Sequence, residues 1–158
     1  MPAPLPGISL TPSRICLGSV VFGSDISRDE SFHVMDAFVE AGGNFLDTAH
    51  IYSAWIEGHW GTSERTLGEW VRARGNRDDL VIATKGGHSP IEDTTKIGRL
   101  SRADLEHDLS ESLERLRMDY VDLYYIHFDE PSRPIEEIVD SLADIQASGR
   151  IRAYGLSN

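Results

Sequence analysis

Residues 101–127 read SRADLEHDLSESLERLRMDYVDLYYIH, a helical pattern followed closely by a strand pattern. Ser101 and Asp104 have the spacing of a helix-capping pair. The leucines that follow recur every three or four residues and so share one helix face: Leu105, Leu109, Leu113 and Leu116. Residues 121–127 are then rich in β-branched and aromatic side chains, as buried strands are. This stretch predicts one helix–strand unit of a parallel α/β fold.

The same alternation extends in both directions along the chain. Further helices are predicted at 29–41, 63–74 and 134–148, and further strands at 15–17, 44–47, 80–85 and 151–157. In 134–148 the apolar side chains expected to face inward are Ile135, Ile138, Val139, Leu142 and Ile145. Residues 8–10 and 15–17 flank a Thr-Pro-Ser turn, so an N-terminal β-hairpin is expected there. The pattern fits a barrel or a doubly wound sheet, and residues 1–158 are interpreted as a single incomplete domain.

The composition disfavours several classes of partner. The 158 residues carry a formal net charge of −11 and a sequence pI of about 4.8, which disfavours binding to nucleic acid or to an anionic membrane surface. Apolar runs such as 80–83 are far shorter than the roughly 20 residues that span a bilayer. Residues 1–7 contain no cationic side chain of a secretory signal, so a cytoplasmic protein that binds small molecules is expected.

Cysteine and histidine show no pattern of a metal site. Cys16 is the only cysteine, which permits no internal disulfide, and its apolar neighbours predict a small buried side chain. The six histidines lack paired ligand spacing with cysteine or carboxylate, so no metal is expected.

Polar side chains end four of the five predicted strands: Asp47, Lys85, His127 and the pair Ser157-Asn158. Because the carboxyl ends of parallel strands meet at one rim, side chains far apart in the sequence are expected to converge there. The alternative is that each residue caps or solvates its own loop. Four strands in succession favour a ligand-binding rim.

Four side chains of this rim together have the chemistry of a carbonyl reductase: Asp47, Tyr52, Lys85 and His127. A tyrosine hydroxyl, with an ordinary pKa of about 10, is a weak proton donor unless its phenolate is stabilised, as a nearby lysine ammonium would do. An aspartate would compensate that ammonium, and a histidine could bind or protonate a carbonyl oxygen. Such donors stabilise the charge that builds on oxygen while hydride reaches carbon.

The loop between residues 48 and 62 leaves two alternatives open. His50 is either a residue beside the pocket or an ordinary solvated loop residue. Trp55 and Trp60 either line a substrate cavity or pack within the loop.

These residues lie in motifs through which residues 15–158 resemble the aldo-keto reductase family. The matching segments are RICLG at 14–18, GNFLDTA at 43–49 followed by Tyr52, Ser63-Glu64 with Leu67-Gly68, IATK at 82–85, LRMDYVDLYYIH at 116–127 and IRAYGLSN at 151–158. The resemblance implies an α/β fold of the (β/α)8 TIM-barrel type. This chain would be its amino-terminal part through strand five, with about five βα units.

The resemblance also implies roles for individual residues. The family's catalytic tetrad falls on Asp47, Tyr52, Lys85 and His127. Tyr52 would be the general acid, Lys85 and Asp47 its tuning pair, and His127 the group that orients the substrate carbonyl. The implied cofactor is NADP(H), with Ser157 and Asn158 bonded to the nicotinamide carboxamide and Asp47 also at the cofactor site. The implied activity is reduction of aldehydes or ketones to alcohols.

The length of the chain adds two expectations. A barrel of this type has eight strands, so strands six to eight, which carry most of the cofactor contacts in relatives, fall outside these residues. A five-stranded arc leaves an open sheet edge, which favours self-association. Two other functions remain as alternatives: a non-catalytic nicotinamide-binding or regulatory subunit, and an inactive truncated fragment.

Overall fold

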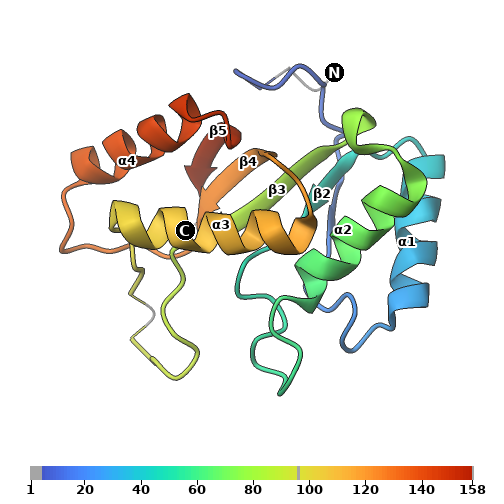
Figure 1. Ribbon diagram of the computed structural model, residues 1–158, viewed down its shortest axis with the longest axis horizontal. Helices are drawn as coiled ribbons and strands as arrows, with labels where there is room; N and C mark the ends of the chain where they lie inside the picture. The colour runs from blue at the N-terminus through green and yellow to red at the C-terminus, as the bar shows by residue number, and fades with distance from the viewer. Residues whose placement is uncertain (1–4, 96, 158) are drawn as a thin grey trace.

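The computed structural model describes residues 5–95 and 97–157 and contains a five-stranded parallel sheet covered by helices (Figure 1). The strands are β1 (Cys16–Gly18), β2 (Phe45–Asp47), β3 (Val81–Gly86), β4 (Val121–Ile126) and β5 (Ile151–Leu156). The helices are α1 (Arg28–Glu40), α2 (Thr62–Arg74), α3 (Arg102–Leu116) and α4 (Ile135–Ala147), and a 3-10 turn, η1 (Arg77–Asp79), precedes β3. These five strands and four helices confirm the predicted alternation.

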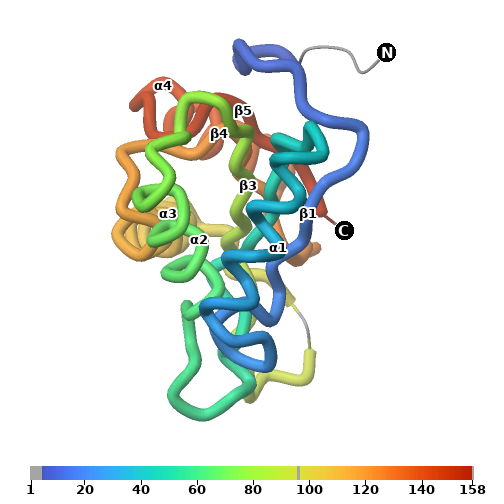
Figure 2. The backbone as a smooth tube through the Cα atoms, turned by 90° about the vertical axis from the view of Figure 1, so that its right-hand side faces the viewer, coloured from blue at the N-terminus to red at the C-terminus, as the bar shows by residue number. Residues whose placement is uncertain are grey.

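The strands follow one another in space in chain order, and each is parallel to the next. A doubly wound sheet reverses its strand order at a switch point, whereas a (β/α) barrel does not. The order therefore identifies the sheet as part of a barrel of the TIM type. In the side view of Figure 2, α2 and α3 lie to the left of β3, and β1 lies to its right.

The register of the sheet brings the polar strand ends onto one face. Asp47 pairs with Ala83 two residues before Lys85, and Lys85 pairs with Tyr125. Cross-strand partners share a face and side chains alternate along each strand, so Asp47, Lys85 and Tyr125 lie on the same face. The neighbouring Tyr124 points the other way, toward α3, where its hydroxyl donates to the Leu105 carbonyl at 3.1 Å.

Local signals set the helix ends. Ser27 caps α1 by accepting from the Glu30 backbone N–H, and the Glu30 side chain accepts from the Ser27 N–H in return. α2 ends at Gly75, whose φ of 63° is left-handed and therefore favours glycine. Ser101 accepts from the Asp104 N–H at the start of α3, as its capping spacing predicts.

The core lies between the helices and the sheet. The four leucines predicted on one face of α3 are all buried there, together with Trp70 of α2 and Tyr124 of β4. The largest fully buried side chains are Trp70, Tyr124, Met35, Leu46, Leu67, Leu80, Ile82, Leu100, Leu105, Leu109, Leu116 and Leu142. Burial on this side holds the helices against the sheet, so that the strand ends have a rigid support.

The predicted N-terminal hairpin is wrong. The described residues before Cys16 contain no strand, and β1 pairs in parallel with β2. Ser13 explains the difference, because its N–H donates to Asn44 Oδ1 at 2.7 Å and its hydroxyl accepts from the Asn44 N–H at 3.1 Å. The segment is thereby tied to the residue before β2 instead of folding back on itself.

Three side chains expected to be buried are exposed. Ile135 and Val139 of α4 are 52% and 43% exposed, because α4 packs through the stripe formed by Ile138, Leu142 and Ile145. Cys16 is also exposed. Partial desolvation and the charge of Asp47 raise its pKa to about 12, so the thiol stays protonated at neutral pH.

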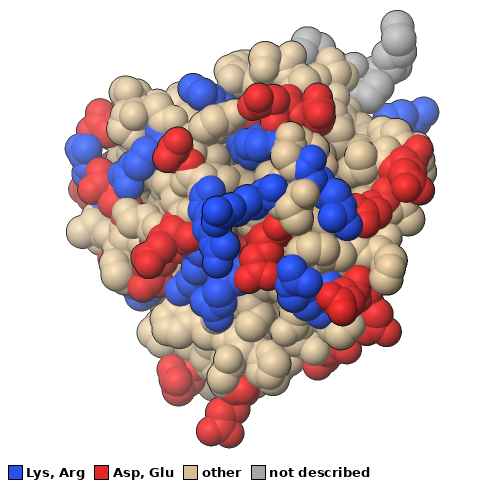
Figure 3. All heavy atoms as spheres, turned by 45° about the vertical axis from the view of Figure 1, so that its right-hand side comes forward, with Lys and Arg blue, Asp and Glu red and all other residues tan. Residues whose placement is uncertain are grey.

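Charge is intermixed on the face seen in Figure 3, where basic and acidic side chains alternate. Ion pairs such as Arg74–Asp36, at 2.7 Å, and Arg102–Asp144, at 2.5 Å, join opposite charges from different helices. None of the described helices has the length and apolar character needed to cross a bilayer.

Gly68 of α2 gives a test of this packing. A Cβ at position 68 would lie 2.3 Å from the backbone oxygen of Leu116, at the end of α3. Because backbone cannot move aside without separating the two helices, Gly68→Ala is expected to lower the free energy of unfolding by about 1–3 kcal/mol. Urea unfolding measures this change. A Cβ at Gly18 would meet no atom within 4 Å, so Gly18→Ala is the matched control. Equal midpoints for the two variants would contradict the prediction.

Candidate active site

The predicted site residues lie at the carboxyl ends of three neighbouring strands. Asp47 is the last residue of β2, Lys85 lies near the end of β3, and His127 directly follows β4. Tyr52 lies in the loop after β2. The backbone N–H of His127 donates to the Gly86 carbonyl at 2.9 Å, which continues the β3–β4 pairing up to the site. Parallel pairing therefore brings together residues that are far apart in the sequence.

Lys85 is the centre of the group. Its Nζ donates to Asp47 Oδ2 at 2.5 Å, to the Tyr52 hydroxyl oxygen at 2.8 Å and to the Thr48 carbonyl at 2.9 Å. The residue is only 7% exposed. A buried ammonium is costly unless it is paired, and here three oxygens surround it. The Tyr52 hydroxyl also lies 3.5 Å from Asp47 Oδ2.

The loop holds Tyr52 through its neighbour Ser53. Ser53 is fully buried and has a φ of 65°, a left-handed conformation that is uncommon for residues other than glycine. Its hydroxyl donates to the Val20 carbonyl at 3.1 Å and lies 3.0 Å from the Ser24 hydroxyl. These contacts hold the strained backbone directly after Tyr52, so the phenol is positioned by a fixed turn.

His127 lies beside the phenol. The two ring centroids are 6.0 Å apart with an interplanar angle of 81°, an edge-to-face arrangement. Burial, together with smaller contributions from the neighbouring His88 and the Lys85 ammonium, lowers the pKa of His127 to about 4. The imidazole is therefore neutral at physiological pH and carries one ring N–H.

The chain that carries this buried lysine site has relatives among known proteins. The sequence model of the Aldo/keto reductase family matches residues 14–158. The chain belongs to this family. Both the resemblance noted in the sequence and the barrel type of the fold are thereby confirmed.

Individual aldo/keto reductases show the same relationship. Norsolorinic acid reductase stcV of Emericella nidulans is 39% identical, over 99% of this chain and 41% of its own length. The NADP(+) aryl-alcohol dehydrogenase of Phanerodontia chrysosporium is 34% identical, over 97% of this chain and 42% of its own. The solved holo form of AKR11C1 from Bacillus halodurans has a TM-score of 0.78 at 31% identity, and the match covers 94% of this chain and 47% of that one. The chain thus spans about two fifths of the length of these curated relatives.

Two of the residues that the aldo/keto reductase resemblance places at the cofactor, Asp47 and Ser157, lie at the carboxyl ends of β2 and β5. Ser157 follows β5 and is exposed, and its N–H donates to the Ile126 carbonyl at 2.9 Å, next to His127. Asp47, also expected at the cofactor, keeps 22% of its side chain exposed despite its bond to Lys85. Asn158, the third residue expected there, lies outside the described residues.

Sequence reasoning missed two groups next to the tetrad. The Thr48 carbonyl accepts from Lys85, and a backbone acceptor has no side-chain signal in a sequence. His88 contacts His127 with ring centroids 5.0 Å apart and Phe128 at 4.3 Å. A signal for His88 existed, since it follows β3 by two residues and therefore belongs to the same rim.

A network of buried charges supports the site from behind. Glu64 of α2 is fully buried and accepts from the Thr84 hydroxyl at 2.7 Å and from Arg115 at 3.2 Å. Arg115 also donates to Glu111 at 2.8 Å and to the His50 carbonyl at 3.1 Å. Thr84 precedes Lys85 and His50 precedes Tyr52 by two, so the network joins α2 and α3 to both segments of the site.

The structure decides between the two alternatives for His50, a residue beside the pocket or an ordinary solvated loop residue. It is 4% exposed, and its Nε2 lies 2.7 Å from Glu111 Oε2, so it is not an ordinary solvated residue. Trp60 packs against it at 5.6 Å and donates from its indole N–H to the His50 carbonyl at 3.0 Å. Among the residues that the structure describes, no three histidine, cysteine or carboxylate side chains are arranged to hold a metal ion.

The lowered pKa of His127 predicts a pH dependence of stability. At a pH between about 4 and 6.5, the imidazole at position 127 is protonated in the unfolded chain, where its pKa is the ordinary 6.5, and neutral in the native protein. The contribution of neutral His127 to the free energy of unfolding is therefore complete above pH 6.5 and decreases as the pH falls toward 4. Urea unfolding of the wild type and of His127→Asn at several pH values measures it. The difference between the two free energies of unfolding should decline over this window, and a constant difference would contradict the assignment.

Proposed function

We propose that the protein is an NADP(H)-dependent oxidoreductase that reduces aldehydes or ketones to alcohols, with Tyr52 as the general acid. The single observation that supports this most is the Lys85 ammonium, which is 2.8 Å from the Tyr52 hydroxyl and 2.5 Å from Asp47. Family membership and a relative named as an NADP(+) aryl-alcohol dehydrogenase support the same class of reaction.

In this mechanism Tyr52 gives its hydroxyl proton to the oxygen of the substrate carbonyl. The phenolate left behind is stabilised by Lys85, which already donates a hydrogen bond to that oxygen. Asp47 compensates the lysine charge, so the ammonium stays in the buried site before and after the transfer. The geometry is in place before substrate arrives, and little reorganisation is needed during the reaction.

His127 has a binding role in this proposal. As a neutral imidazole beside Tyr52, it can donate its one N–H to the substrate carbonyl without competing as an acid. Its donor would hold the carbonyl oxygen near the phenol. His127 is thus the positioning donor and Tyr52 the proton source, the division of roles that the family resemblance implies.

The residues present fit a nicotinamide cofactor. Ser157 is exposed, and the Asp47 carboxylate is partly exposed. Gly18 is the β1 partner of Asp47, and a Cβ added at Gly18 would meet no atom within 4 Å. There is therefore free space beside Asp47. Ser157 and Asn158 would hold the nicotinamide carboxamide, and Asp47 would also lie at the cofactor site. The cofactor would supply the hydride that reduces the carbonyl carbon.

Three expectations from the sequence stay predictions. We infer that residues 1–158 form one partial barrel domain whose substrate is a small carbonyl compound. The exposed Leu156 on the last strand, 61% accessible, is consistent with self-association through the open edge of β5. Location in the cytoplasm is the third.

Tyr52→Phe tests the assigned acid. The substitution removes one hydroxyl and keeps the ring, so the rate of NADPH-dependent reduction of an aromatic aldehyde by the full-length protein should fall by about 10²–10⁴-fold. Absorbance of NADPH measures the rate. Tyr120→Phe is the matched control, because Tyr120 lies between Arg77 and Arg152 and outside the site. Turnover that is unchanged in Tyr52→Phe would refute the role.

The same assay separates the alternatives. Tight NADPH binding with no turnover over a broad panel of aldehydes would favour a non-catalytic nicotinamide-binding subunit. Fluorescence titration of NADPH against residues 1–158 alone addresses the truncated-fragment alternative, which predicts no binding.

A further inference from the structure

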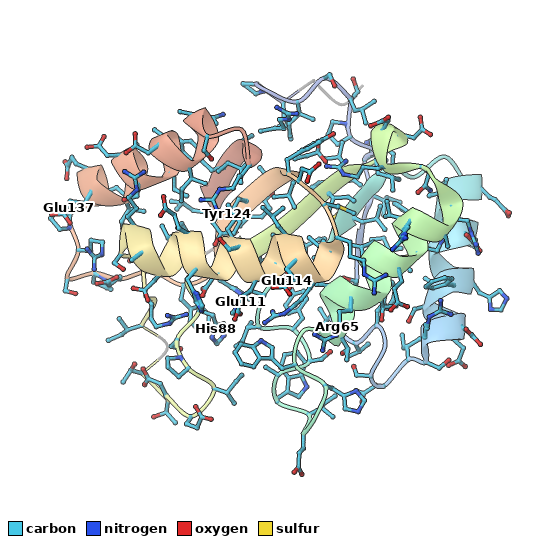
Figure 4. All side chains as sticks on the ribbon, in the orientation of Figure 1. Arg65, His88, Glu111, Glu114, Tyr124 and Glu137 are labelled. Atoms are coloured by element: carbon cyan, nitrogen blue, oxygen red, sulfur yellow. The ribbon has the colours of Figure 1, made fainter. Side chains whose placement is uncertain are left out.

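A cavity of about 380 Å³ lies outside the tetrad, between α3 and the loops that follow β2 and β3. In Figure 4, Glu111 and His88 mark this region below α3. The cavity is lined by His50, Ile51, Ala54, Trp60, His88, Ser89, Pro90, Ile91, Glu92, Arg99, His107, Asp108 and Glu111. None of the four tetrad side chains is among them. Its volume is that of pockets that hold small organic molecules.

One part of the lining is apolar and exposed. Trp60 is 49% exposed and Ile91 is 42% exposed, although each lies in a wall of the cavity. Ile51, which is buried, Ala54 and Pro90 are the other apolar residues of the lining. A half-exposed tryptophan beside aliphatic groups is a surface on which a flat ring packs well.

A second feature is a hydroxyl that lacks a partner. Ser89 lines the cavity and is 1% exposed, and its Oγ has no hydrogen bond to any residue that the structure describes. An unpaired buried hydroxyl costs free energy that a ligand can recover. An occupant of the cavity is therefore the hydrogen-bond partner that we assign to this hydroxyl.

The charges of the lining select the sign of the occupant. The carboxylates Glu92, Asp108 and Glu111 outnumber the one arginine, Arg99. Arg99 is already engaged, because it donates to the His88 carbonyl and to Asp104 and Asp108. Arg99 is thus not available to an anion, and the other basic side chains of the lining are His50, His88 and His107.

Glu111 offers the acceptor. Its Oε2 is shared by His50 and Arg115, whereas Oε1 has only the exposed His107 at 3.6 Å. Oε1 of this cavity-lining carboxylate can thus accept from a cationic donor.

We propose that this cavity is a second ligand site, separate from the tetrad, for a small aromatic molecule that carries a protonated amine or amidine. The ring packs on Trp60 and Ile91, the cationic group donates to Glu111, and Ser89 takes a further hydrogen bond. His88 forms a wall of the cavity and also contacts His127, so the occupant lies one side chain away from the tetrad. The proposal does not depend on carbonyl reduction.

Calorimetric titration of the full-length protein with benzamidine and with benzoate, in the absence of cofactor and aldehyde, tests the charge selection. The two probes have the same ring and opposite charge. Benzamidine should bind saturably and at least about tenfold more tightly than benzoate at this site. Failure of benzamidine to bind, or displacement of benzamidine by an aldehyde substrate, would overturn the proposal.

Paired serine variants locate the binding. Ser89→Ala should weaken benzamidine binding about three- to tenfold, the loss of one hydrogen bond, and should leave benzoate binding unchanged. Ser112→Ala is the matched control, because Ser112 is also buried with an unpaired hydroxyl but lies in α3 outside the cavity lining. Equal effects of the two substitutions would place benzamidine elsewhere and refute the site. Since no turnover is measured, this outcome is independent of the Tyr52→Phe result.

Discussion

The rest of the site depends on the hydrogen bonds that the Lys85 ammonium donates. It is almost fully buried and reaches oxygens of Asp47, Thr48 and Tyr52, which come from the end of one strand and the loop after it. A lysine in such a place is stable only if its partners are fixed, because loss of one leaves charge without compensation. The register between β2 and β3 fixes these partners, so the short strand β2 is more important than its three residues suggest.

The charge network behind the strands extends this support into the helical layer. Glu64, Arg115 and Glu111 link α2 and α3 to the strand of Lys85 and to the loop of Tyr52. Each charge in it faces an opposite charge or a hydrogen-bond donor, as burial requires. The loop is long, yet it is held by Arg115 at one position and by Ser53 at another. The loop is thereby held on both sides of Tyr52, at His50 and at Ser53.

Much of this arrangement could be predicted from the sequence because it depends on periodicity. The leucines of α3 and the glycine after α2 set element boundaries, and the polar residues at strand ends indicated the rim. The hairpin failed because its evidence was local, whereas the Ser13–Asn44 bonds that decide the segment span 31 residues. Ile135 and Val139 were misjudged for a related reason: an apolar helix face predicts burial only where another element lies against it.

The contacts around the tetrad lay further beyond sequence reasoning. His50 and Glu111 are 61 residues apart, and nothing in either local pattern predicts that they pair. The Thr48 carbonyl has no side-chain signature at all. Residue types and strand positions therefore indicated the members of the site, but the groups that hold them came only from the three-dimensional packing.

Consecutive strand order also has a consequence for synthesis. Because each strand pairs with the one translated just before it, the sheet can grow at a single edge as the chain leaves the ribosome. Asp47, Tyr52, Lys85 and His127 all precede β5, so the four side chains are translated before the fifth strand.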